Sequence, residues 1–99
     1  IADFTEAIRL NPQDAGAYNN RGYAYLYQKQ YPLALDDFTS ALDLNPQGAN
    51  LYDSLGDYYL HIGDYDNAIA NFDKALAINP DLNVARKNRE IALRKKRGE

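Results

Sequence analysis

The sequence repeats itself with a period of 34 residues, and this repetition limits the possible folds more than any other feature. Ala15–Gly48 is followed without a gap by a second copy, Ala49–Leu82, and the two copies agree at twelve aligned positions. The shared pairs include Tyr18/Tyr52, Gly22/Gly56, Ala34/Ala68, Phe38/Phe72, Ala41/Ala75 and Pro46/Pro80. A fixed period in this range is typical of proteins that stack one structural unit on the next. We therefore expect a stacked-repeat architecture.

The residues on either side of the two copies extend the pattern. Residues 1–14 align with 35–48 and share Asp, Phe, Thr, Ala, Leu and Asn-Pro-Gln with them. We expect one domain over 1–99, in which 1–14 is the second half of a repeat, 15–48 and 49–82 are full repeats, and 83–99 is a capping helix with a basic tail. Because Ile1 lies inside a helical pattern with no cap before it, we expect the chain to be a piece of a longer one.

The local pattern is helical along the whole chain. Apolar residues recur with helical spacing, as at Phe4, Ala7 and Ile8, and no window shows the sustained alternation of a strand. Helices are predicted over 2–10, 15–28, 31–44, 48–62, 65–78 and 82–97. Three aspartates are predicted N-caps, because a side-chain oxygen at that position accepts a hydrogen bond from the first turn; they are Asp14, Asp64 and Asp81. The prediction is an all-α fold of antiparallel helix pairs.

Small residues recur at the same register in both copies. A glycine inside a helix costs about 1 kcal/mol relative to alanine, yet Gly22 and Gly56 both lie inside predicted helices. This repetition indicates a steric requirement: neighbouring helices approach closely at the small residues, and aromatic side chains such as Phe38 and Phe72 fill the space beside them.

This pattern resembles the tetratricopeptide repeat (TPR) family, whose unit carries an aromatic, Leu-Gly, Tyr, Tyr, Ala, Phe, Ala and Pro in order. The second copy supplies Tyr52, Leu55-Gly56, Tyr59, Tyr65, Ala68, Phe72, Ala75 and Pro80. The first copy matches except at Arg21, where the family prefers Leu. The resemblance implies a right-handed superhelical solenoid of antiparallel helix hairpins. It also implies a concave groove, lined by the first helix of each hairpin, that in the family commonly holds a peptide from another protein.

The resemblance also assigns candidate residues to this groove, one stripe on each first helix. They are Asn19, Asn20, Tyr23, Leu26 and Tyr27, then Asp53, Asp57, Leu60 and His61, then Lys87, Asn88, Ile91 and Arg94. Tyr23 and Tyr27 lie outside the repeated core positions, so they are either a platform for a ligand or packing residues against neighbouring helices. Asp53 and Asp57 make the centre acidic, which favours a partner that brings Lys or Arg.

Two more specific binding modes were compared with these positions. Asn20, Ser54 and Asn88 share one register, where amides would hydrogen-bond an extended peptide backbone; the alternative is that they are solvated polar residues. The clamp by which TPR proteins hold the C-terminal carboxylate of chaperones uses Lys, Asn, Asn, Lys and Arg. The matching positions here are Asn19, Tyr23, Ser54, Val84 and Asn88. We therefore do not expect chaperone-tail binding through that clamp.

The sequence does not favour catalysis. It has no cysteine and one histidine, His61, which is expected to form a surface hydrogen bond with Asp57 four residues earlier. No Ser-His-Asp set, phosphate loop or dinucleotide turn is present. We expect no enzyme activity, no metal and no cofactor, and hence an interaction module that binds an unidentified protein or peptide.

The two ends raise alternatives. The basic run Arg94-Lys95-Lys96-Arg97 is a solvating face that suits a helix C-terminus, a nucleic-acid or anionic-membrane contact, or a contact with an acidic body; nucleic acid is disfavoured because no aromatic is interleaved. Ile1, Phe4 and Ile8 form an apolar face, so a second possible function is a structural segment that oligomerises through residues 1–10. With no signal peptide or transmembrane run, a cytoplasmic location is the default expectation.

Overall fold

The computed structural model describes the backbone of residues 2–99 and the side chains of residues 3–99, and every regular element in this range is a helix. The helices are α1 (Ala2–Leu10), α2 (Ala15–Tyr27), α3 (Tyr31–Leu44), α4 (Ala49–His61), α5 (Tyr65–Ile78) and α6 (Asn83–Lys96). They form two compact units, one ending at Pro46 and the other covering Gln47–Glu99. The all-α prediction is confirmed.

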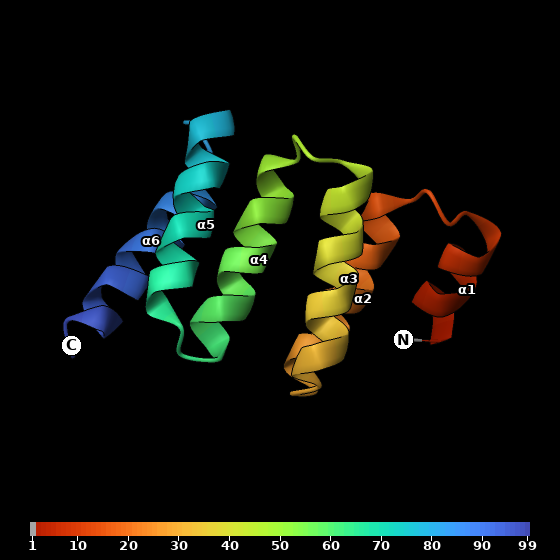
Figure 1. The fold of residues 1–99 in the computed structure, drawn as a ribbon, viewed down its shortest axis with the longest axis horizontal. Helices are drawn as coiled ribbons and strands as arrows, with labels where there is room; N and C mark the ends of the chain where they lie inside the picture. Colours follow the sequence, from red (N-terminus) through yellow and green to blue (C-terminus); the bar gives the residue numbers. More distant parts are fainter. Residues whose placement is uncertain (1) are drawn as a thin grey trace. The chain divides into compact units, whose positions relative to one another are not determined.

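The first unit is the α2–α3 hairpin with α1 packed against α2 (Figure 1). Asp14 is the N-cap of α2, as predicted, because its Oδ1 accepts a hydrogen bond from the Ala17 amide at 3.2 Å. Pro32 lies in the first turn of α3, where its missing N–H has no helical partner to lose. These signals position α2 and α3 as a tight antiparallel pair.

Close contact at Gly22 holds this hairpin together. A Cβ atom on Gly22 would lie 2.8 Å from Cδ1 and Cε1 of Phe38 on α3, closer than carbon atoms pack. Phe38 is 1% exposed, and the small residues Ala34 and Ala41 beside it on α3 are fully buried. The glycine is therefore required by the packing of the aromatic ring, as the repetition predicted.

Arg21, the residue that departs from the family pattern, has its own partner in the hairpin. Its Nε and Nη2 donate to the two carboxylate oxygens of Asp37 on α3, at 2.8 and 2.7 Å. The guanidinium lies over the rings of Tyr18 and Tyr25, at 5.9 and 5.8 Å from their centroids. It also donates to the Thr5 hydroxyl of α1 at 3.3 Å. One arginine thus links all three helices of the unit.

The second unit contains the α4–α5 hairpin and α6, which packs on both (Figure 1). A Cβ atom on Gly56 would lie 2.6 Å from Cε1 of Phe72, so this pair repeats the Gly22–Phe38 contact. The core cluster contains Ala68, Phe72, Ala75, Ala85 and Ala92. Ala85 and Ala92, seven residues apart, lie on the face of α6 that covers the hairpin.

The turns within the two hairpins have the same geometry. In each, a residue with positive φ follows the first helix, Lys29 at φ 61° and Gly63 at φ 82°. The amides of Gln30 and Asp64 reach back to the carbonyls of Tyr25 and Tyr59, both at 2.9 Å, which closes the helix C-terminus in the usual left-handed way. Asp64 then caps α5, as predicted, through the Asn67 amide.

One predicted cap is wrong. Asp81 does not cap the last helix, because its amide donates a hydrogen bond to Oδ1 of Asn79 and the residue lies within the turn. Leu82 is the N-cap of α6 and makes no side-chain capping bond. In the exposed stretch before it, Asn79 performs the local hydrogen bonding that the prediction had given to Asp81.

The face of α1 that was predicted to be open is only partly covered. Phe4, Ala7 and Ile8 are half-buried, and Ile1, the fourth candidate in this region, lies outside the described residues. Among residues 2–99, the helices are too short and too polar to span a membrane.

Candidate functional site

The candidate residues of the first unit lie on α2 and are centred on two tyrosines. Tyr23 packs edge-on against Phe38 of α3, with ring centroids 5.1 Å apart and an angle of 77°. Its other side stacks on Tyr27, at 6.0 Å and 27°. Tyr27 is 69% exposed. Tyr23 is therefore a packing residue that also holds the exposed ring of Tyr27 in place, so both interpretations of the pair apply in part.

Asn19 and Asn20 precede these tyrosines by one turn. Asn20 is exposed and Asn19 is half-buried. The Oδ1 of Asn19 is buried and accepts no hydrogen bond from the part of the chain described here. A buried acceptor left in this state costs about 1–3 kcal/mol, so Asn19 is a polar group of α2 that gains from a new donor. Leu26, also on the predicted stripe, is 1% exposed and belongs to the core.

In the second unit, Asp53 on α4 is a buried carboxyl group. It is 7% exposed, and Nδ2 of Asn88 on α6 donates to its Oδ1 at 3.5 Å, a long hydrogen bond. Burial raises the pKa of Asp53 to about 6; the Asn88 hydrogen bond opposes the rise and the charge of Asp57 adds to it. Asp53 is thus a group whose charge changes near neutral pH inside the α4–α6 contact.

Asp57 and His61 form the surface pair that the sequence predicted, one turn apart on α4. Nδ1 of His61 lies 3.7 Å from the Asp57 carboxylate and 2.8 Å from the Asp57 carbonyl oxygen. When Nδ1 carries a proton, it donates to that carbonyl. Asp57 is half-buried and His61 is exposed, so the acidic surface of α4 comes from Asp57 more than from Asp53.

The predicted asparagine ladder is largely used within the second unit. Ser54 is 3% exposed, and its hydroxyl donates to the carbonyl of Asn50 at 2.9 Å. The amide of Asn88 is directed at Asp53. Asn20 is the exposed member of the three.

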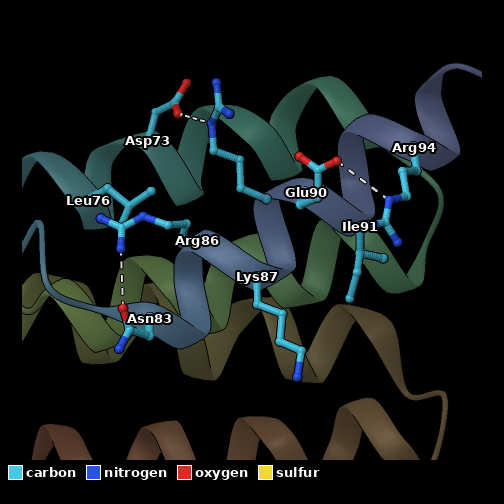
Figure 2. A pocket seen from close by; sticks show the side chains of 9 residues that line it. Asp73, Leu76, Asn83, Arg86, Lys87, Glu90, Ile91 and Arg94 are labelled. Carbon is cyan, nitrogen blue, oxygen red and sulfur yellow. Dashed lines mark hydrogen bonds and ion pairs between the residues drawn. The ribbon is translucent and has the colours of Figure 1, made fainter.

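Lys87 is exposed and borders a groove that the sequence analysis did not single out (Figure 2). We call it the α5–α6 groove. It measures about 930 Å³, and Leu76 of α5 and Ile91 of α6 supply its apolar surface. Four basic residues and two acidic ones also line it: Arg86, Lys87, Arg89 and Arg94, with Asp73 and Glu90. Ion pairs join Arg89 to Asp73 and Arg94 to Glu90. The missed signal was the register of Arg89, which equals that of Arg21.

The geometry offers little for catalysis. Among residues 2–99, no group of three His, Cys, Asp or Glu side chains is arranged to hold a metal ion. His61 and Asp57 contact each other one turn apart on a helix, as surface pairs commonly do. The exposed tyrosine, the acidic patch of α4 and the basic groove are features of surfaces that contact other macromolecules.

Comparison with known proteins agrees with this architecture. The family model described as tetratricopeptide repeat matches residues 13–81. The Arabidopsis OM64 TPR domain is 29% identical, with a TM-score of 0.80 over 90% of this chain and 74% of that one. A thermophilic TPR protein of Thermus thermophilus is also 29% identical, with a TM-score of 0.84 over 91% of this chain and 46% of the other.

A third structure shows the same fold at lower identity. The first TPR of Spaghetti (RPAP3), bound to an HSP90 peptide, is 20% identical and has a TM-score of 0.83 over 93% of this chain and 73% of that one. A search of the curated proteins found no match. With the family model covering more than half of the sequence, the chain belongs to the tetratricopeptide repeat family.

Proposed function

We propose that this chain is a protein–protein interaction module that binds a peptide segment through the first helices of its hairpins. Its TPR fold supports this, since the Spaghetti (RPAP3) domain of the same fold is bound to a peptide. The observation that carries the proposal is the pair on α2: Tyr27 is 69% exposed and is held by the anchored ring of Tyr23. A rigid exposed aromatic is the kind of residue that dominates binding energy at interfaces.

The charge and polarity of the neighbouring positions support a basic peptide. Asp57 gives α4 an acidic surface, which attracts Lys or Arg on the partner. Asn19 carries a buried oxygen that has no donor among the described residues, and the amide of a bound chain would satisfy it after a small side-chain rotation. Neither the first-helix stripes nor α6 carries the chaperone clamp, so the proposed ligand is not a C-terminal carboxylate held in that way.

Peptide selection tests this proposal. Random peptides displayed on phage are selected against the wild-type chain and against the Tyr27→Ala and Asp57→Asn variants. We expect wild type to enrich sequences with Lys or Arg, Tyr27→Ala to lose binding, and Asp57→Asn to lose the basic preference. Leu33→Ala is the matched control, because Leu33 is an exposed apolar residue on a second helix, α3. Enrichment that survives Tyr27→Ala and Asp57→Asn unchanged overturns the assignment.

A further inference from the structure

The α5–α6 groove contains an arginine whose counterpart in the first unit has one more partner. Arg89 of α6 follows Arg21 of α2 by 68 residues, two full periods. Arg21 contacts Thr5 of the preceding helix and the carboxylate of Asp37 on the helix that follows it. Arg89 contacts Asp73, which holds the register of Thr5. Within residues 2–99, no carboxylate contacts Arg89 in the manner of Asp37.

The two full hairpins show that this pair of positions varies together. Where the first helix has Arg21, the second helix has Asp37 and the two form an ion pair. Where the first helix has Leu55, the second has Asn71, which donates to the Asn67 carbonyl of its own helix instead. An arginine at this register is thus matched to an aspartate one helix later, and Arg89 favours a neighbouring helix that carries one.

Helix α1 carries that aspartate in the required context. Asp3 lies 34 residues before Asp37 and holds its register, and Phe4, Ala7 and Ile8 hold the registers of Phe38, Ala41 and Leu42. Phe38 and Ala41 are 1% and 0% exposed in their hairpin, whereas Phe4 and Ala7 are only half-buried. The face of α1 that resembles the α2-facing side of α3 therefore has room for another helix.

We propose that α1 of a second copy of this chain docks in the α5–α6 groove, with its Asp3 paired to Arg89. The charges are complementary, because the groove has four basic and two acidic side chains and α1 carries Asp3, Glu6 and Arg9. Leu76 and Ile91 give its apolar residues a surface to cover. The contact is head-to-tail, so it leaves an unoccupied α1 and an unoccupied groove at the two ends, and assembly continues without closing.

Glu90 sets the strength of this contact. It holds the register of Gly22 and Gly56, where even a Cβ atom would lie within 2.8 Å of the packed phenylalanine ring. The ring of Phe4 therefore cannot approach α6 as closely as Phe38 approaches α2, and the association is weak. Removing the Glu90 side chain and its Cβ opens the same space that the two hairpins use.

Sedimentation velocity of the whole chain over a wide concentration range tests the proposal. We expect the average mass of wild type to rise continuously through dimer and trimer. Asp3→Arg and Arg89→Asp each place like charges together and weaken association by about tenfold. Asp3 is exposed, and the Arg89–Asp73 ion pair lost in the second variant is solvent-accessible, so circular dichroism should show an unchanged fold.

Mixing the two charge variants provides the sharpest outcome. In an alternating assembly, the arginine introduced by Asp3→Arg faces the aspartate introduced by Arg89→Asp, and the next contact is the wild-type pair. The mixture should therefore recover most of the association that each variant loses alone, and its mass should again rise through dimer and trimer.

Changes at Glu90 test the docking geometry separately. Glu90→Gly should tighten association severalfold, whereas Glu90→Ala should not, because its Cβ remains. A wild-type monomer at all concentrations, a closed dimer, association indifferent to Arg89→Asp, or a mixture that associates no better than its components overturns the proposal. None of these outcomes bears on peptide binding by α2.

Discussion

The aromatic ring of Phe72 occupies the space that a side chain on Gly56 would need: a Cβ atom there would lie 2.6 Å from Cε1 of the ring. Phe72 is fully buried, so it has no free volume into which it can retreat. The same relationship joins Gly22 and Phe38 at 2.8 Å. Each hairpin therefore depends on a glycine that helix propensity alone would disfavour.

Gly56→Ala should destabilise the fold by about 1–2 kcal/mol. The substitution gains about 1 kcal/mol of helix propensity but forces an overlap whose relief in packed cores typically costs about 1–3 kcal/mol, with a backbone shift added. Urea denaturation measures the change in the free energy of unfolding.

Phe72→Leu provides the control for this prediction. Alone it should destabilise by leaving unfilled space, but combined with Gly56→Ala it should cost less than the sum of the two single changes, because the shorter side chain makes room for the Cβ. A Gly56→Ala variant as stable as wild type would contradict the steric explanation.

Transferring the second hairpin's neutral pair into the first should be tolerated. Arg21→Leu alone leaves Asp37, whose side chain is 5% exposed, as a buried carboxylate without its partner, and should destabilise by about 3 kcal/mol. Asp37→Asn alone should also destabilise, since Arg21 loses its counter-charge. Together they reproduce the Leu55–Asn71 arrangement and should return stability to within about 1 kcal/mol of wild type. Thermal and urea unfolding of all four proteins gives the coupling, and strictly additive losses would show that the two positions do not act as a pair.

Stability should fall with rising pH because of Asp53. Its pKa is about 6 in the folded chain against an ordinary value of 3.8, so the folded state binds more protons between these values. The free energy of unfolding therefore decreases as pH rises from about 4 to about 6, by about 1–3 kcal/mol from this group.

The Asp53→Asn variant isolates this contribution from the other carboxylates. It should be more stable than wild type at pH 7, equal or less stable at pH 4, and the difference between the two curves should appear between pH 4 and 6. Asp57→Asn is the matched control on the same helix. A difference curve that is flat over this range would show that Asp53 titrates normally.

The hairpin turns predict opposite effects for two substitutions at one register. Gly63 has φ 82° and Lys29 has φ 61°, a region that costs a non-glycine residue about 1–2 kcal/mol. Gly63→Ala should therefore destabilise the second unit by about 1 kcal/mol. Lys29→Gly should stabilise the first by about 0.5 kcal/mol, because relief of the backbone conformation exceeds the added freedom of the unfolded chain. Differential scanning calorimetry measures both, and a destabilising Lys29→Gly would mean that the lysine side chain makes contacts that offset its backbone.

Local signals were sufficient to predict the helices and their packing. The proline and glycine positions ended the helices within one or two residues of the observed bounds, and the repeated Gly22 and Phe38 gave the close contact. The cap at Asp81 failed because Asn79 forms the local turn first. The register itself held the better prediction, since Asp14, Gly48 and Leu82 follow one another at the repeat period and each is the observed N-cap.

Depth within the fold could not be read from the stripe of candidate positions. Asp53 and Tyr27 both lie on it, yet one is 7% exposed and the other 69%. The difference arises because Asn88 of α6, 35 residues away in the sequence, contacts Asp53. Which residue of a later helix faces a given carboxylate depends on how α6 packs on α4, and that packing is set by Ala85 and Ala92 rather than by any local pattern.

The matched positions Arg21–Asp37 and Leu55–Asn71 also bear on how a chain of near-copies avoids assembling in the wrong order. If α3 formed a hairpin with α4 during folding, Asp37 would face Leu55 and become a buried charge without a counter-ion, at a cost of several kcal/mol. Misassembly between similar units is a characteristic failure of repeat proteins. The arginine that departs from the family pattern thus labels its own second helix and keeps neighbouring repeats from exchanging theirs.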